Sequence, residues 1–262
     1  MDRIVIVRLL FIGDIIGEPG RKKLAHSLPE LIKKENIFFT IAQGENLAGG
    51  LGITEKTAKE IFNYGVDCIT TGNHIWKYKE IYKYLDSEPR LLRPANYPEG
   101  VPGRGYNIFE KMGIKIGIIN LEGRVFMRPL EDPFRTGKKI AEVIQKQTKN
   151  IFIDFHAEAT SEKRALALYL ADYATGIIGT HTHIQTADEQ IINKKCAYIT
   201  DAGMVGSTDS IIGVKKEEII EHFLLHLPKK FKVAKENIVG NCVIIDFDEN
   251  NGIAKEIERI RF

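Results

Sequence analysis

Histidine, asparagine and carboxylate side chains gather at five short polar turns, each of which follows an apolar, strand-like run. The turns contain Gly-Asp at 13–14, Gly-Glu-Asn at 44–46, Gly-Asn-His at 72–74, Asp-Phe-His at 154–156 and His-Thr-His at 181–183. In open α/β sheets, the loops at the carboxyl ends of the strands converge on one crevice. If the strands are neighbours, the turns bring together a set of seven polar side chains: Asp14, Glu45, Asn46, Asn73, His156, His181 and His183.

The side-chain types in this set favour a transition metal. Carboxylate, carboxamide and imidazole donors suit manganese, iron or zinc, whereas calcium and magnesium favour shells made of oxygen alone. The set contains no cysteine, which argues against a structural zinc. Seven donors suffice for two metals that share a carboxylate. Two metals about 3.5–4 Å apart can hold a hydroxide and stabilise an in-line phosphoryl displacement.

Each residue of the set also has a purely structural interpretation. Asp14 could cap a helix, and an asparagine beside a glycine could be a turn residue in left-handed conformation. His156, which follows an apolar run, could be a hydrogen-bonded core histidine. His181 and His183 share a face if the backbone there is extended, although about 0.2 such pairs are expected by chance in a chain of this composition.

The other histidines and the lysine doublets are weaker candidates for catalysis or metal binding. His26 lies on an amphipathic helix pattern. His222 and His226 are four residues apart, but no glutamate follows His222 as an HExxH zinc motif requires. The lysine doublets, such as Lys33-Lys34, are interpreted as solvated surfaces.

Composition bounds the class of protein. The chain has 262 residues, of which 44% are apolar and 27% charged, and its net charge is +2, so disorder is excluded and strong binding to nucleic acid or membrane is not expected. Cys68, Cys196 and Cys242 form no CxxC pair, which is typical of a reducing cytoplasm. No apolar run reaches about 18 residues. We therefore expect a cytoplasmic protein, and residues 1–6 are open to interpretation as a non-native or alternative start.

Short β-branched runs alternate with amphipathic patterns, which predicts an α/β fold. Helices are expected from Pro19, around 58–62 and over 76–85, 137–147, 162–171 and 216–227. An Asn-Gly turn at 251–252 predicts a C-terminal antiparallel hairpin, hence a mixed sheet or two stacked sheets. No linker or repeat is present, so residues 1–262 are expected to form one domain. Strands are predicted at 4–12, 38–42, 68–70, 114–120, 151–155, 174–178, 197–200, 239–247 and 253–260.

The order of these motifs resembles the calcineurin-like metallophosphoesterases, and most closely their bacterial YmdB-type branch. The resemblance runs over roughly residues 8–214. It includes the distinctive stretches GENLAGGLGIT at 44–54, RPANYP at 93–98, LEGRVFM at 121–127, DFHAEATSEK at 154–163 and GTHTHIQTADEQI at 179–191.

The resemblance implies a four-layer α/β/β/α sandwich, in which two mixed β-sheets are flanked by helices and two metal ions lie at one sheet edge. It implies iron or manganese, with zinc as an alternative. It also implies that Asp14, Asn46 and His183 bind one metal, that Asn73, His156 and His181 bind the other, and that Glu45 bridges them.

The implied reaction is hydrolysis of small anionic phosphodiesters such as 2′,3′-cyclic nucleotides. A bridging hydroxide attacks the phosphorus, and His74 stays unligated as the general acid.

The sequence departs from the wider family in two places. The superfamily opens with Asp-x-His, but Asp14 is followed by Ile15-Ile16, so Asn46 is expected to replace that histidine. The branch commonly has an acidic residue where this chain has Lys77. A positive charge near His74 would disfavour its imidazolium form, unless Lys77 points to solvent.

Two alternatives remain. A phosphomonoesterase would use the same metals, and the choice depends on how the loops at 121–127 and 201–210 read the second ester group. A metal-binding regulatory protein with weak residual activity would need no unligated His74. The sequence leaves open whether the chain forms a homo-oligomer. A dinucleotide site at 13–20 is excluded because its glycine spacing differs from GxGxxG.

Overall fold

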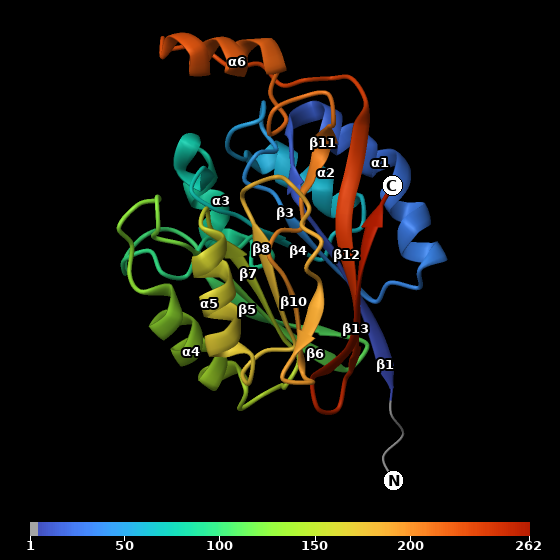
Figure 1. The fold of residues 1–262 in the computed structure, drawn as a ribbon. Coiled ribbons are helices and arrows are strands. Elements are labelled where there is room, and N and C mark those ends of the chain that lie inside the picture. The colour runs from blue at the N-terminus through green and yellow to red at the C-terminus, as the bar shows by residue number, and fades with distance from the viewer. Residues whose placement is uncertain (1–4) are drawn as a thin grey trace.

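The computed structural model describes residues 5–262, which form two mixed β-sheets packed face to face between layers of helices (Figure 1). The suggested alternative start at residues 1–6 falls mostly on residues 1–4, which lie outside the described residues. The seven-stranded sheet has the order β2 (Asp14–Ile15), β11 (Met204–Ser207), β12 (Ile238–Asp248), β1 (Ile6–Ile12), β3 (Phe39–Gln43) and β4 (Cys68–Thr70), with β13 (Ile253–Arg261) paired to β12. The six-stranded sheet has the order β5 (Tyr106–Lys111), β6 (Ile114–Glu122), β7 (Ile151–His156), β8 (Gly176–Thr180), β10 (Cys196–Ile199) and β9 (Gln190–Ile192).

Parallel pairing aligns the strand ends that carry the polar turns. In the first sheet β1, β3 and β4 run parallel, and in the second β6, β7, β8 and β10 do so. Antiparallel strands complete both sheets, since β12 pairs with β1 and β13, and β5 and β9 form the edges of the second sheet. Both sheets are therefore mixed, as the sequence predicts.

Successive side chains of β1 lie in different cores, on opposite faces of the first sheet, which shows how the layers form. Leu10 and Ile12 pack outward with Leu24 and Leu28 of α1 (Gly17–Lys34), in a core that also holds α2 (Glu55–Asn63) and α3 (Ile81–Ser87). Leu9 and Phe11 point into the core between the two sheets. A third core joins the second sheet to α4 (Pro133–Ile144) and α5 (Thr160–Leu170). Three cores separate four layers, so the predicted α/β/β/α sandwich is confirmed.

Some predicted elements differ from the observed ones. The helix expected over 76–85 is interrupted: a 3₁₀ turn spans Ile75–Lys77, Tyr78 is extended, and α3 begins at Ile81. Helix α1 begins two residues before Pro19. The hairpin of β12 and β13 is confirmed, with Gly252 at a φ of 68° in its turn. The short strands β2 and β11, together with β5 and β9, were not predicted because each depends on its neighbour for pairing.

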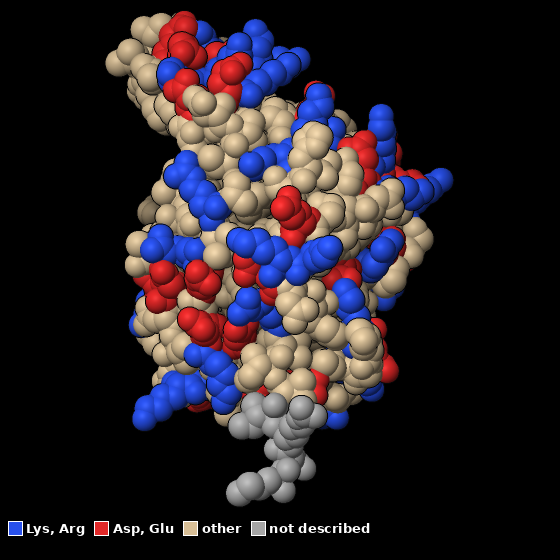
Figure 2. Space-filling view, turned by 90° about the vertical axis from the view of Figure 1, so that its right-hand side faces the viewer, with Lys and Arg blue, Asp and Glu red and all other residues tan. Residues whose placement is uncertain are grey.

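The surface and the cysteines agree with the composition. Figure 2 shows basic and acidic side chains interspersed over one face, without a field of a single sign. All three cysteines, Cys68, Cys196 and Cys242, are buried and free. Among the described residues, no helix is both long and apolar enough to cross a membrane.

Phe152 tests the core between the sheets. It is fully buried, and its ring packs edge-on against Phe247 with centroids 5.2 Å apart. We expect Phe152→Ala to lower the free energy of unfolding by about 3–5 kcal/mol, because it removes a ring and leaves a cavity. Urea denaturation measures this change. Phe126→Ala removes a ring that is 88% exposed and should cost less than about 0.5 kcal/mol. Equal costs for the two variants would contradict the assigned core.

Candidate metal centre

The structure brings together all eight side chains that the sequence singled out. Asp14 follows β1, the Glu45 and Asn46 pair follows β3, and the Asn73 and His74 pair follows β4. From the second sheet come His156, the last residue of β7, and the two histidines after β8, His181 and His183. The carboxyl ends of strands in both sheets therefore contribute to one cluster.

Glu45 lies in the middle of the cluster. Its Oε1 is 3.2 Å from His156 Nε2 and 3.1 Å from His74 Nδ1, and it accepts a hydrogen bond of 3.2 Å from Asn46 Nδ2. Its Oε2 accepts the backbone N–H of His74 at 3.0 Å. One buried carboxylate thus contacts residues from both sheets.

The remaining side chains lie on two sides of Glu45. On one side, His183 Nε2 is 3.6 Å from Asp14 Oδ1 and 3.4 Å from Asn46 Nδ2. On the other, His156 Nε2 is 3.0 Å from His181 Nδ1 and 3.1 Å from Asn73 Oδ1. These side chains thus form two groups, with Glu45 between them.

The donor set fits metal ions on three observations. Ligand atoms of Glu45, His156 and His181 all lie within 4.8 Å of one another. The Oδ1 atom of Asp14 is buried without a hydrogen-bond partner, which is costly unless a cation accompanies it. Glu45 is fully buried as well. Two buried carboxylates, three imidazoles and two carboxamides form a transition-metal donor set.

The pKa values show that the cluster attracts positive charge. Burial by itself would raise the pKa of Asp14, but the neighbouring His183 lowers it below its usual value. Burial likewise opposes ionisation of Glu45, whose pKa is nevertheless held well below its usual value by His156 and His74. Burial disfavours the charged form of His156, yet Glu45 and Asp14 outweigh it and raise the pKa of His156 to about 9. The carboxylates thus stay ionised, and a proton on His156 offsets part of their charge.

The backbone at the two later histidines is not extended. His181 has a φ of 98° and His183 a φ of 66°, in a region that residues other than glycine rarely adopt. A shared strand face is therefore not what joins them, and that premise was wrong. Instead, each left-handed residue turns its side chain into the cluster, and such strain persists only where surrounding contacts fix it.

A buried ion pair supplies those contacts. Lys163 Nζ on α5 is 2.7 Å from Asp201 Oδ2, and both side chains are buried. The same oxygen accepts hydrogen bonds from the backbone N–H of Thr182 at 3.0 Å and from its hydroxyl at 2.7 Å. Thr182 lies between the two histidines, so this pair holds the loop that carries them.

A second series of contacts orients the His156 ring from the side that faces away from the cluster. Its Nδ1 is 3.0 Å from Thr180 Oγ1, and the Thr180 hydroxyl donates to Asp154 Oδ1 at 2.8 Å. Burial raises the pKa of Asp154 to about 7. A metal-binding histidine commonly donates its other N–H to an oxygen that fixes the ring. Thr180 Oγ1 and Gln43 Nε2, each 3.0 Å from Nδ1, hold the ring on that side and leave Nε2 facing the cluster.

Another buried carboxyl lies beside the centre. Glu122, the last residue of β6, pairs with His156 in the strand register and accepts a 3.1 Å hydrogen bond from the Tyr97 hydroxyl. Burial raises its pKa to about 7.

Sequence reasoning missed Glu122, Asp154, Lys163 and Asp201. The polar positions at the carboxyl ends of β6 and β7 were the available signal for the first two.

His74 and Lys77 differ in where they lie. Nδ1 of His74 is 2.9 Å from Asn46 Oδ1, and its side chain is 33% exposed. Lys77 is exposed on the 3₁₀ turn that follows. Because Lys77 is exposed to solvent, water screens its positive charge from His74.

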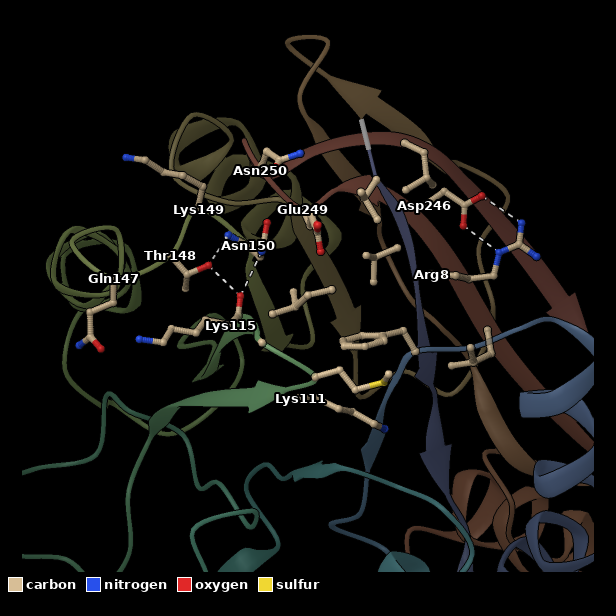
Figure 3. Close-up of a pocket in the computed structure, with 18 of the residues that line it drawn as sticks. Arg8, Lys111, Lys115, Gln147, Thr148, Lys149, Asn150, Asp246, Glu249 and Asn250 are labelled. Carbon is tan, nitrogen blue, oxygen red and sulfur yellow. Dashed lines mark hydrogen bonds and ion pairs between the residues drawn. The ribbon is translucent and has the colours of Figure 1, made fainter. Parts of the chain in front are cut away.

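A cavity of about 1320 Å³ is separate from this centre (Figure 3). It lies at the amino ends of β1 and β7, where Arg8 pairs with Asp246 and Asn150 donates to the backbone oxygen of Lys115. None of the eight clustered residues lines it. A smaller cavity of about 610 Å³ does include His183 and adjoins the centre.

Comparison with known proteins identifies relatives of the whole chain. A family model described as "YmdB-like protein" matches residues 10–260. The 2′,3′-cyclic-nucleotide 2′-phosphodiesterase of Bacillus subtilis (strain 168) is 47% identical, over 97% of this chain and 96% of its own length.

Two solved structures are similar to this chain over nearly its whole length. A hypothetical protein of Thermus thermophilus superposes with a TM-score of 0.91 at 37% identity, covering 98% of this chain and 99% of that one. A protein described as a novel phosphatase of Mycoplasma pneumoniae superposes with a TM-score of 0.93 at 33% identity, covering 99% of this chain and 94% of that one.

Lys163→Met tests the ion pair behind the histidine loop. Removing the lysine leaves Asp201 buried and unpaired, which typically costs about 3–5 kcal/mol of stability. We expect bound metal to fall as well, measured by elemental analysis at a temperature where the variant is folded, because Thr182 loses its anchor. Lys22→Met removes an exposed partner of Glu18 and should change neither quantity. Full metal content in folded Lys163→Met would show that the pair does not position the histidines.

Gly72→Ala tests the close packing around His156. A Cβ at position 72 would lie 2.1 Å from His156 Cδ2, so the ring has to move. We expect folded protein with strongly reduced metal content. Gly49→Ala is the control: a Cβ there meets nothing within 4 Å, and although its φ of 67° adds backbone strain, the variant should retain its metal. Normal metal binding by Gly72→Ala would contradict the assigned role of His156.

Proposed function

Because the chain belongs to the YmdB-like protein family, we propose that it is a metal-dependent phosphodiesterase that hydrolyses small phosphodiesters, with 2′,3′-cyclic nucleotides as the substrate class. The observation that carries the proposal is the single buried cluster around Glu45, which draws ligand types for two metals from both sheets. The name and 47% identity of the Bacillus subtilis relative support the substrate class. We further propose that residues 1–262 act as one domain, since neither sheet alone holds the cluster.

The residues divide into two overlapping ligand sets. Asp14, Asn46 and His183 would hold one metal, and Asn73, His156 and His181 the other. Glu45 lies between the sets and would serve both. Two transition-metal ions, for which we propose iron or manganese, would supply an activated water and positive charge for the phosphoryl oxygens.

His74 would act as the general acid. Its Nδ1 faces the Asn46 Oδ1 acceptor and Glu45 Oε1, so that nitrogen retains its proton. Within residues 5–262 no hydrogen bond is formed by its Nε2, and the ring is partly exposed. In the imidazolium form, Nε2 therefore carries a proton that it can give to the departing ester oxygen. A residue held by the ligands but turned to solvent suits proton transfer better than metal binding.

The cavity beside His183 offers room for the organic part of a substrate. Ser207 and Thr208 line it, together with Arg259 and Arg261. Ser207, the last residue of β11, and Thr208 belong to the segment 201–210 that the sequence suggested for reading the second ester group. A diester needs such contacts on both sides of the phosphorus. This placement supports a phosphodiesterase over a phosphomonoesterase.

Metal analysis and a substrate panel test the proposal together. We expect two metal ions per chain and faster turnover of 2′,3′-cyclic nucleotides and bis-p-nitrophenyl phosphate than of p-nitrophenyl phosphate. His74→Ala should retain its metal while turnover falls by about 10²–10⁴. Asp14→Asn and His181→Ala should lose metal as well as activity.

Each alternative has its own outcome. Preferred hydrolysis of p-nitrophenyl phosphate would make the protein a phosphomonoesterase. Two bound metals without turnover of any of these esters would favour a metal-binding regulatory role. Loss of metal from His74→Ala would remove it from the role of general acid.

A further inference from the structure

An aromatic ring stands in a strained turn close to the metal centre. Residues 124–127 form a β-turn in which Met127 N donates to Arg124 O at 3.2 Å. Phe126 occupies the third position of this turn with a φ of 62°. A turn with positive φ at its third position ordinarily carries glycine or asparagine there. For a residue as bulky as phenylalanine, this conformation is an outlier.

Burial does not explain the presence of Phe126. Its side chain is 88% exposed, so the ring adds almost nothing to the core. Strained backbone persists only where the surrounding structure fixes it, and it is concentrated at functional sites. A ring that is held in a strained turn and covered by no other residue suits contact with a ligand.

The loop that carries this ring is fastened at both ends to the carboxyl end of β6. At its start, Gly123 N donates to His156 O at 2.9 Å. At its end, the buried Asn96 side chain donates to Glu131 O at 3.0 Å and to the backbone oxygen of the last residue of β6 at 2.8 Å. We call residues 123–131 the β6 loop. It leaves and returns beside one of the proposed metal ligands.

One buried carboxylate holds the turn inside the β6 loop. Glu162, in the first turn of α5, accepts the backbone N–H of Arg124 at 2.9 Å and that of Val125 at 3.1 Å. The side chain of Glu162 is buried. These hydrogen bonds fix the two residues that precede Phe126, so the exposed ring is carried by a backbone that is held in place.

Electrostatics place the second half of the β6 loop near the centre. Burial raises the pKa of Glu122 to about 7, and the charges of His156 and Arg128 oppose that rise. Because such effects weaken with distance, Arg128 lies near the same carboxyl as the proposed ligand His156. Phe126 precedes Arg128 by two residues, which puts its ring at the rim of the centre.

We propose that Phe126 is a specificity-determining residue whose ring stacks on the nucleobase of a substrate held at the metal centre. The inference rests on the proposed function and adds to it the group that selects nucleotides among phosphodiesters. Aromatic side chains stack on any base, since every base has a π-face. A stacking ring has to stay uncovered until the base arrives, which accounts for its exposure.

The shape of a 2′,3′-cyclic nucleotide fits this placement. Its ribose carries the base on the carbon next to O2′ and the 5′-hydroxymethyl group on the carbon next to O3′, so the two groups flank the phosphate on opposite sides. The cavity beside His183 adjoins one ligand set, and the β6 loop adjoins the other at His156. A phosphate bound between the sets can direct its base to Phe126 and its 5′ end to the cavity.

Kinetics of the metal-loaded full chain test the proposal with two esters. One is 2′,3′-cyclic AMP, and the other is glycerol 1,2-cyclic phosphate, a cyclic diester without a base. We expect Phe126→Ala to lower the ratio of kcat/KM for the nucleotide to kcat/KM for the base-free ester by about 5- to 100-fold, which is the loss expected for one stacked base. The change should appear mainly in KM, because stacking holds substrate and transition state alike. Phe126→Trp should retain the ratio.

Two further variants separate stacking from a structural role. Met112 is 90% exposed and has a φ of 50°, but it lies in the hairpin turn between β5 and β6, at the amino end of β6. Met112→Ala should keep the ratio of the unaltered chain. Phe126→Gly relieves the strained backbone, so its unfolding temperature should be no lower than that of the unaltered chain while the ratio falls. A lower unfolding temperature would assign the ring to the fold and overturn the proposal.

A binding measurement separates this inference from the proposed function. Isothermal titration calorimetry with adenosine 3′-monophosphate reports affinity without turnover, and Phe126→Ala should weaken that affinity by about 5- to 100-fold. A chain that hydrolyses neither ester but binds the nucleotide through Phe126 would contradict the proposed reaction and support the stacking site. A ratio or an affinity that Phe126→Ala leaves unchanged would exclude stacking, and so would a chain that does not bind the nucleotide.

Discussion

The structure is organised around two carboxylates, Asp14 and Glu45, that are removed from water at the carboxyl ends of neighbouring strands. Burying an ionised carboxylate is costly unless positive charge and hydrogen-bond donors surround it. The first sheet supplies the carboxylates and the second supplies His156, His181 and His183. Neither sheet could bury its share alone, so the face-to-face packing of the two sheets and the chemistry of the centre depend on each other.

Buried charged groups behind the clustered side chains also have hydrogen-bond or ion-pair partners. Asp154 reaches His156 through the Thr180 hydroxyl, and Lys163 neutralises Asp201 beneath the histidine loop. These contacts fix rings and loop conformations that the strands themselves do not determine. The left-handed backbone at His181 and His183 is an example, because without such anchors that conformation would relax. The rigidity of the centre therefore comes from helix α5 and the strand ends as much as from the ligands.

The strands and the clustered residues could be predicted because they follow from local patterns, whereas the four layers were implied by the family resemblance. Buried apolar runs mark the strands, and the polar residue directly after each run marks the edge where parallel strands converge. The Lys163–Asp201 pair escaped prediction because a lysine in an amphipathic helix is ordinarily a surface residue. The break at Tyr78 and the two-residue strand β2 escaped because tertiary pairing decides them. The helix predicted over 216–227 is present as α6 (Lys216–Leu225), but only the fold shows that Ile219 is its one buried residue.

The place of β1 in the first sheet has a consequence for the order in which the protein folds. This strand lies between β3 and β12, and Arg8 on β1 pairs with Asp246 on β12 across 238 residues of sequence. Contacts that distant make folding slow, because a long loop must close before they form. During synthesis, one edge of β1 has no pairing partner until β12 has left the ribosome. The sheet that carries Asp14 and Glu45 therefore cannot be completed until nearly the whole chain has been synthesised.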